Sequence, residues 1–220
     1  MFETFRTRIK FCGLVRPQDI QTAVSLGVDA IGFVFYPPSS RFLTLDDAAV
    51  LRRQLPSWVS AVGLFVDAAP ALVQEHSSRL GLDVIQFHGN ESVATCHDSL
   101  LPDQPYWRAV RMQSPDDLIT SCAVHKNAEA FLLDAHTEGY GGSGEGFDWD
   151  WVPSNFQAPL IVSGGLHSGN VGKAIECLRP VAVDVSSGIQ TSPREKDPAR
   201  MEAFVQTVLA ADAQALKRKS

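Results

Sequence analysis

The sequence of 220 residues contains no long apolar run and few cysteines, and each shortage excludes a class of protein. No stretch approaches the roughly 18 apolar residues of a membrane span, and residues 1–10 lack the apolar centre of a signal peptide. We therefore expect a cytoplasmic chain with no membrane partner. The cysteines lie far apart without a CxxC pair, so neither a zinc site nor a disulfide framework is indicated. They are Cys12, Cys96, Cys122 and Cys177.

Basic residues are also fewer than acidic ones, with 19 Lys and Arg against 25 Asp and Glu. The formal net charge of −6 argues against a general affinity for nucleic acid, so a phosphate group would have to be held in a local pocket. With 45% hydrophobic and 20% charged residues, the composition is that of an ordinary globular protein. The length suits one α/β barrel, and we expect residues 1–220 to form a single domain.

Short apolar runs alternate with helical patterns along nearly the whole chain. The predicted strands are Arg8–Phe11, Ala30–Phe35, Ala61–Val66, Val84–Phe87, Trp107–Met112, Ala130–Leu133, Leu160–Val162 and Val181–Val185. Strands that are apolar on both faces, each followed by a helix, indicate a parallel sheet covered by helices. Eight such units favour a closed (β/α)₈ TIM barrel, with an open doubly wound sheet as the alternative.

The helical patterns also predict where helices begin and which side chains face the core. Pro17 and Pro70 suit a first helical turn, Thr44 suits an N-cap, and a short helix is expected near 150–155. Two later helices carry apolar residues at core spacing. These residues are Leu118, Ile119 and Cys122, and then Met201, Phe204, Val205, Val208 and Leu209.

Chemistry in a barrel takes place where the strands end, so the residues that follow each strand are the candidates for the site. The run Phe131–Leu133 ends in Asp134 and opens into a glycine-dense loop, 135–146. A buried strand that delivers a carboxylate to such a loop predicts a catalytic acid. The alternative is an ordinary strand-end aspartate beside a mobile surface turn.

Cys12 follows the first strand and can face Asp134 across a barrel. The pKa of a thiol falls when cations or helix N-termini are near, which gives a usable base close to neutral pH. The alternative is that Cys12 is an inert small hydrophobe. Cys96, Cys122 and Cys177 lie in helical patterns, and we assign them structural roles.

Glycine-rich turns follow the seventh and eighth strands, as Ser163-Gly164-Gly165 and Ser186-Ser187-Gly188. Backbone N–H groups at turns after these two strands of a barrel are typical of phosphate sites. The alternative is that each is only a tight turn.

Two further side chains complete the set of candidates. Arg41 follows the stiff sequence Pro37-Pro38-Ser39-Ser40 and can hold a carboxylate with two hydrogen bonds, unless it is only a solvated loop arginine. His88 ends the fourth strand and has either a direct role or only the task of satisfying a backbone group at the rim.

These motifs, in this order, resemble the phosphoribosylanthranilate isomerase family of the tryptophan pathway, from about residue 8 to residue 209. The resemblance rests on Lys10-Phe11-Cys12-Gly13, Arg41, Gln86-Phe87-His88-Gly89, Leu132-Leu133-Asp134, Gly141-Gly142-Ser143-Gly144, Phe147-Asp148-Trp149, Ser163-Gly164-Gly165-Leu166 and Val183-Asp184-Val185-Ser186-Ser187-Gly188.

The resemblance implies an Amadori rearrangement of N-(5-phosphoribosyl)anthranilate, with Asp134 as the acid and Cys12 as the base. Arg41 would bind the anthranilate carboxylate, and the loop 139–146 would close over the substrate. Asp184 and His88 would make further substrate contacts. No metal or organic cofactor is implied, because the imine serves as the electron sink, and the chain would act as a monomer or homodimer. The phosphate would be held by Gly142, Gly164, Gly165, Ser186, Ser187 and Gly188.

The sequence departs from the family pattern at three places. Ser143 stands where threonine is usual, Pro38 stands where lysine is common, and the segment 192–197 lacks the usual glycine, which we expect to affect only the rim. Two other functions remain as alternatives. A related phosphosugar isomerase, such as that of histidine biosynthesis, would use two carboxylates, and Cys12 argues against it. A non-catalytic phosphosugar-binding barrel would not need Cys12 and Asp134 together.

Overall fold

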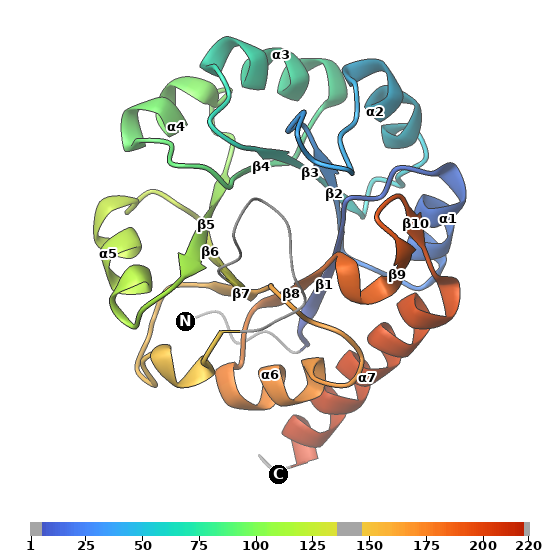
Figure 1. Cartoon of the computed structure of the whole chain (residues 1–220), viewed down its shortest axis with the longest axis vertical. Coiled ribbons are helices and arrows are strands. Elements are labelled where there is room, and N and C mark those ends of the chain that lie inside the picture. Colours follow the sequence, from blue (N-terminus) through green and yellow to red (C-terminus); the bar gives the residue numbers. More distant parts are fainter. Residues whose placement is uncertain (1–5, 136–146, 218–220) are drawn as a thin grey trace.

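Eight parallel strands close into a barrel with the helices arranged around it, as Figure 1 shows for the computed structural model. The structure describes residues 6–135 and 147–217. Neighbouring strands pair in sequence order, and β1 pairs with β8 to close the ring. This confirms the TIM barrel, and the open doubly wound alternative is wrong. The strands are β1 (Arg8–Cys12), β2 (Ala30–Val34), β3 (Ser60–Phe65), β4 (Val84–Phe87), β5 (Tyr106–Met112), β6 (Ala130–Ala135), β7 (Leu160–Val162) and β8 (Ala182–Val185).

The helices begin where local chemistry favours it. Pro17 and Pro70 are first helical residues, and the Thr44 hydroxyl accepts a hydrogen bond from the Asp47 N–H at 3.1 Å. The short helix expected near 150–155 is a 3₁₀ turn that begins earlier, η1 (Trp149–Trp151). The α-helices are α1 (Pro17–Ser25), α2 (Leu45–Arg52), α3 (Pro70–Leu80), α4 (Val93–Ser99), α5 (Asp116–Val124), α6 (Val171–Leu178) and α7 (Pro198–Lys217).

The core lies between the strands and the helices. Phe204 of α7 is fully buried and packs edge-on against Phe11 of β1, with ring centroids 6.1 Å apart. Two of the predicted core positions are wrong, since Ile119 is 48% exposed and Leu209 is 45% exposed. Each follows a buried residue by one position, and one residue turns an α-helix by about 100°, which carries the side chain off the narrow buried stripe. Leu118, Met201, Val205 and Val208 are buried as expected, and Cys122 is half-buried.

A small hairpin stands between β8 and α7. After β8, the 3₁₀ turn η2 (Ser187–Ile189) leads into β9 (Gln190–Ser192), which pairs with β10 (Glu195–Lys196). Figure 1 shows this hairpin beside α1 at the mouth of the barrel. Arg16 ties it there, since its guanidinium lies 2.7 Å from a Glu195 oxygen and donates to the Lys196 carbonyl at 3.0 Å.

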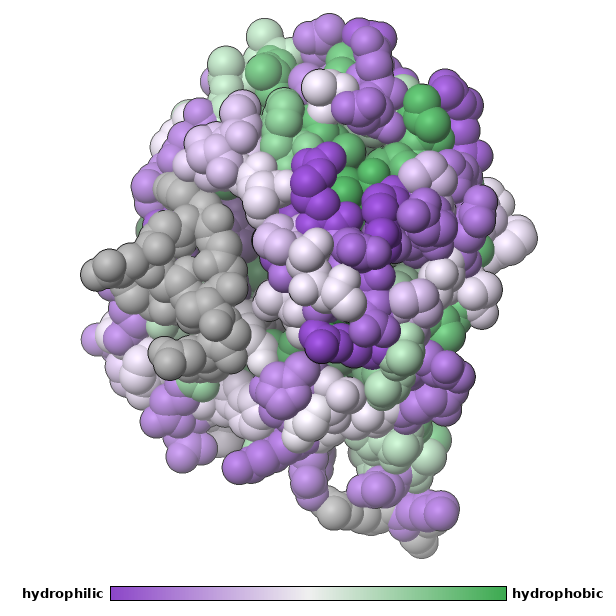
Figure 2. Space-filling view, turned by 45° about the vertical axis from the view of Figure 1, so that its right-hand side comes forward, coloured by the Kyte–Doolittle hydropathy of each residue, from purple (hydrophilic) through white to green (hydrophobic). Residues whose placement is uncertain are grey.

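Hydrophilic residues predominate on the face drawn in Figure 2, with smaller hydrophobic areas between them. Among the described residues, the most exposed large hydrophobic side chain is Trp58, at 79%. In the part of the chain that the structure describes, no helix is both long and apolar enough to cross a membrane.

Candidate active site

A cavity of about 100 Å³ lies at the carboxyl ends of the strands and collects nearly all the predicted site residues. Gly142 lies outside the described residues. Gly188 does not line the cavity but sits against the turn after β7, where a Cβ atom on it would be 2.0 Å from the Leu166 carbonyl oxygen. The predicted residues that line the cavity are Cys12, Arg41, His88, Asp134, Gly164, Gly165, Asp184, Ser186 and Ser187.

Asp134 and His88 form a direct pair. The Nε2 atom of His88 lies 3.0 Å from Oδ2 of Asp134, and both side chains are mostly buried. The other ring nitrogen of His88 lies 3.0 Å from the amide nitrogen of Gln86, whose amide oxygen is buried and has no hydrogen-bond partner among the described residues. The His88 ring therefore contacts the candidate acid. The alternative for His88, that it only satisfies a backbone group at the rim, did not predict this contact.

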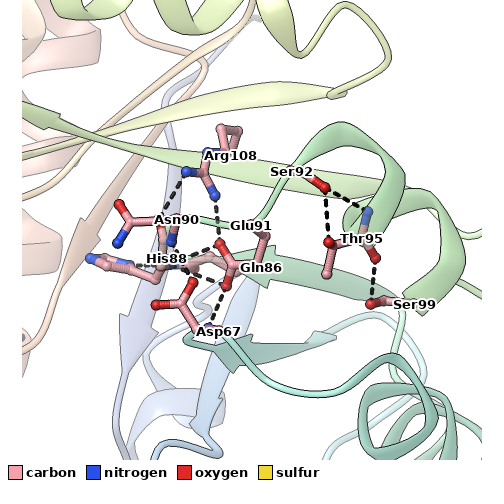
Figure 3. Close-up of polar contacts among 10 residues, drawn as sticks. Asp67, Gln86, His88, Asn90, Glu91, Ser92, Thr95, Ser99 and Arg108 are labelled. Atoms are coloured by element: carbon pink, nitrogen blue, oxygen red, sulfur yellow. Dashed lines mark hydrogen bonds and ion pairs between the residues drawn. The ribbon is translucent and has the colours of Figure 1, made fainter.

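A buried ion pair holds the loop that carries His88. Arg108 of β5 lies 2.6 Å from Glu91 and also donates to the carbonyl of Gly89 at 2.8 Å. Glu91 accepts hydrogen bonds from the backbone N–H groups of Gly89 and Asp67, so one carboxylate joins two loops, as Figure 3 shows. Because Gly89 follows His88 directly, this network fixes the position of the imidazole that meets Asp134.

Cys12 ends β1 and is 6% exposed. Burial is the largest effect on its thiol and raises the pKa, and the negative charge of Asp184 raises it further. The positive charges of Lys10 and Lys196 act to lower the pKa. The net shift is upward, so the fall that the sequence suggested is wrong for the protein without substrate. The thiolate is the form that can act as a base, and its amount depends on these buried charges.

Two lysines near Cys12 were missed as functional residues. Lys10 lies two positions before Cys12 on the same strand, and its ammonium is 2.9 Å from Oδ1 of Asp184. Lys196 is 2% exposed and donates to the Ser186 carbonyl at 2.8 Å, although we expected its segment to affect only the rim. Burial, and next the charge of Arg41, lower the pKa of Lys196 to about 7. Strand alternation could have identified Lys10, but no local pattern marks Lys196.

The turn after β7 needs both of its glycines. Gly164 and Gly165 have φ angles of +70° and +67°, a region that residues with a Cβ rarely adopt. A Cβ on Gly164 would lie 2.2 Å from the Ala135 nitrogen and 2.8 Å from Oδ1 of Asp134. The missing side chain therefore leaves room for the candidate acid, as well as exposing backbone to the cavity.

Arg41 is half-buried, which contradicts the alternative of a solvated loop arginine. One of its terminal nitrogens donates to the Gln190 side chain at 2.9 Å, and its Nε atom is buried without a hydrogen-bond partner among the described residues. Burial lowers the pKa of Arg41. Gly13 makes room for this side chain, since a Cβ there would be 2.4 Å from the Arg41 Cδ atom. A cation with an unsatisfied donor at the wall of a cavity is suited to an anionic ligand.

A larger cavity, of about 350 Å³, lies at the opposite end of the molecule, between α6, α7 and the start of β1. Its lining includes Thr7 and Asp212, which hydrogen-bond each other at 2.7 Å. The amino ends of the strands, which it adjoins, are where barrels place stabilising contacts. Within residues 6–135 and 147–217, no cluster of His, Cys, Asp or Glu side chains is suited to a metal ion.

Solved structures of two isomerases are similar to this chain. Phosphoribosyl anthranilate isomerase from Thermotoga maritima has a TM-score of 0.83 and 34% identity, and the alignment covers 93% of this chain and 99% of that one. The enzyme of that name from Thermus thermophilus has a TM-score of 0.84 and 28% identity over the same shares of the two chains.

Curated sequences agree with the structures. N-(5'-phosphoribosyl)anthranilate isomerase of Dechloromonas aromatica is 46% identical over 207 residues, which is 94% of this chain and 98% of that protein. The Leptothrix cholodnii protein of the same name is 46% identical over 215 residues, covering 98% and 96% of the two chains. The family profile described as N-(5'phosphoribosyl)anthranilate (PRA) isomerase matches residues 9–207. The chain therefore belongs to the N-(5'-phosphoribosyl)anthranilate isomerase family.

Proposed function

We propose that this chain converts N-(5-phosphoribosyl)anthranilate into 1-(2-carboxyphenylamino)-1-deoxyribulose 5-phosphate, a step of tryptophan biosynthesis. The observation that carries the proposal is that Cys12 of β1 and Asp134 of β6 line one cavity at the carboxyl ends of the strands. An Amadori rearrangement needs an acid and a base that reach the same sugar, and these two side chains supply them.

Asp134 acts first, as the acid. Its proton goes to the ribose ring oxygen while the bond from that oxygen to C1′ breaks. The lone pair of the anthranilate nitrogen forms the C1′=N bond, which leaves a protonated imine and an Asp134 carboxylate. His88 bonds the same carboxyl group at 3.0 Å, and so holds it in one orientation toward the cavity.

Cys12 acts second, as the base. Its thiolate removes the C2′ proton, and the electrons of the C2′–H bond form the C1′=C2′ double bond as the imine electrons return to nitrogen. The resulting enolamine tautomerises to the ketone. Because the protonated imine accepts the electrons, the reaction needs neither a metal nor an organic cofactor.

The anionic ends of the substrate have separate sites. Arg41 binds the anthranilate carboxylate, which provides the acceptor that its buried Nε atom lacks among the described residues. The phosphate lies against the turns at Gly164-Gly165 and Ser186-Ser187-Gly188, and we assign Gly142, which lies outside the described residues, to the same group. Asp184 also lines the cavity, and we assign it the orientation of the substrate amine. We assign the whole activity to one domain, in a monomer or a homodimer.

The test is the loss of anthranilate-type fluorescence when purified protein meets freshly generated phosphoribosylanthranilate. We expect rapid loss with the wild-type protein and near-background loss with Asp134→Asn. If the wild-type protein causes no loss, the proposed reaction is wrong. Activity on a different phosphosugar would then indicate a related isomerase, and binding of a phosphosugar without turnover would indicate a non-catalytic barrel.

A further inference from the structure

A buried ion pair stands directly behind Cys12. The ammonium group of Lys10 lies 2.9 Å from Oδ1 of Asp184, and the two side chains are 1% and 5% exposed. The Cys12 sulfur lies beside this ammonium group, whose charge acts to lower the pKa of the thiol. Gly32 of β2 makes room for this arrangement, since a Cβ there would lie 2.8 Å from the sulfur and 3.1 Å from the Lys10 nitrogen.

The barrel fixes this geometry through its backbone. Lys10 pairs in register with Asp184 across the β1–β8 seam that closes the ring. Lys10 and Cys12 are two residues apart on one strand, so their side chains point to the same side of the sheet. Strand pairing therefore brings Asp184, 174 residues away in sequence, against Lys10, on the side of the sheet that also carries Cys12.

Lys10 does not line the cavity, whereas Cys12 and Asp184 do. Its side chain is fully enclosed, so any influence on a substrate must act through these two neighbours. A buried cation and a buried anion cost free energy to desolvate, and a hydrophobic pair of similar volume is often at least as stable. The ion pair is therefore better explained by its effect on Cys12 than by stability.

We propose that the Lys10–Asp184 pair sets how much of Cys12 is thiolate, with Lys10 favouring the thiolate and Asp184 opposing it. Lys10 is then a positioning residue for the base. The consequence for catalysis rests on the proposed function, but the effect on the thiol does not.

Other charged groups face the same region, so the contribution of Lys10 must be separated from theirs. Lys196 of β10 is bonded to Ser186, and because burial lowers its pKa to about 7 it loses its charge where a thiol begins to ionise. Arg41 is turned toward Gln190, and its charge also acts on Cys12. For Lys10, burial lowers the pKa, but the charges of Asp184 and Cys12 outweigh burial and the net shift is upward. Lys10 is thus a cation that stays charged beside the sulfur.

The test is the rate of alkylation of Cys12 by iodoacetamide as a function of pH, followed by mass spectrometry of the peptide that contains Cys12. This reaction requires thiolate and no substrate, so its outcome is independent of whether the isomerase reaction is observed. We expect Lys10→Met to raise the midpoint pH by about one unit, which slows alkylation about tenfold near neutral pH. We expect Asp184→Asn to lower the midpoint by about the same amount. Cys177, which is exposed, serves as the internal control because its midpoint should not move.

The opposite signs distinguish an electrostatic role from a structural one. A variant that merely loosened the barrel would move Cys12 toward the behaviour of a free thiol whichever charge was removed. Shifts of the same sign, or no shift in either protein, would overturn the proposal. Because Lys10→Met leaves Asp184 buried without its partner, the double variant Lys10→Met/Asp184→Asn is made as well. The midpoint pH of the double variant should fall between those of the two single variants. If Lys10→Met does not fold, Asp184→Asn is compared with the double variant alone. A midpoint of Asp184→Asn at or above that of the double variant would then overturn the proposal.

Discussion

The imidazole of His88 at the end of β4 and the carboxyl group of Asp134 on β6 are 46 residues apart in sequence, and their Nε2 and Oδ2 atoms lie 3.0 Å apart. The other ring nitrogen is 3.0 Å from the Gln86 amide. The ring is therefore held on both sides, by the Gln86 amide at one nitrogen and by the candidate acid at the other.

We expect His88→Asn to lower kcat about 10- to 100-fold with little change in KM, because Asp134 remains but loses the partner that orients it. His97→Gln is the matched control, since His97 is 83% exposed and lies on the outer helix α4. Steady-state kinetics of both proteins checks this. A wild-type kcat in His88→Asn would remove His88 from the mechanism.

Gly164→Ala should reduce both stability and turnover. Its φ of +70° strains any residue with a Cβ, and the added atom would meet Ala135 and Asp134. Gly81→Ala provides the comparison, because Gly81 also has a positive φ, +57°, but has nothing within 4 Å of the added atom. We expect Gly81→Ala to lower the free energy of unfolding by about 1 kcal/mol without loss of activity. We expect Gly164→Ala to lower it by roughly 1–3 kcal/mol more, and to lower kcat at least about tenfold. Urea unfolding and turnover assays measure the two effects, and equal losses in both proteins would contradict the steric argument.

Arg41→Met should raise KM about 10- to 100-fold, because a charge-assisted hydrogen bond to the substrate carboxylate contributes roughly 1.5–3 kcal/mol. Arg41→Lys should recover only part of this loss, since an ammonium group cannot present two parallel donors. Arg53→Met, which alters an exposed arginine at the end of α2, should behave as wild type. If Arg41→Met left KM unchanged, the carboxylate would have to bind elsewhere.

Lys196 gives the folding stability a specific dependence on pH. Its pKa is about 7 in the folded protein and 10.5 in the reference state, so between these values the unfolded chain holds a proton that the folded protein has released. The free energy of unfolding therefore rises with pH across this window. Below it, both states hold the proton and Lys196 adds no dependence on pH. Relative to Lys196→Met, the free energy of unfolding of the wild type should rise by up to about 1.4 kcal/mol per pH unit. Urea unfolding of the two proteins from pH 6 to pH 10 measures the difference, and a difference that fell or stayed level would contradict the assignment.

The sequence predicted the barrel because each strand is a short apolar run with clear limits. The strands Val84–Phe87 and Leu160–Val162 have the predicted boundaries, since a proline or a polar residue stops each of them, and Pro70 begins its helix as predicted. Ile119 and Leu209 were placed in the core wrongly, because an apolar residue next to the buried stripe of a helix looks the same in sequence as one within it.

Much of the site was predictable because many of its residues lie at strand ends. Cys12, His88 and Asp134 could be read from the ends of β1, β4 and β6, since a barrel brings those positions together. Lys196 could not, because it reaches Ser186 from a hairpin whose position depends on contacts with Arg16, some 180 residues away in sequence. Contacts of that kind leave no periodic signal. The role of Gly164 beside Asp134 likewise emerges only from the packing of two neighbouring strands.

The most direct test of the acid and base assignment is the turnover of phosphoribosylanthranilate by Cys12→Ser and by Asp134→Asn, each checked by calorimetry for binding of an unreactive product analogue. Both substitutions preserve size, so the cavity should still bind the analogue with nearly wild-type affinity. We predict that turnover falls by about 10²-fold or more in each protein. Near wild-type turnover in either protein would contradict the role assigned to that residue.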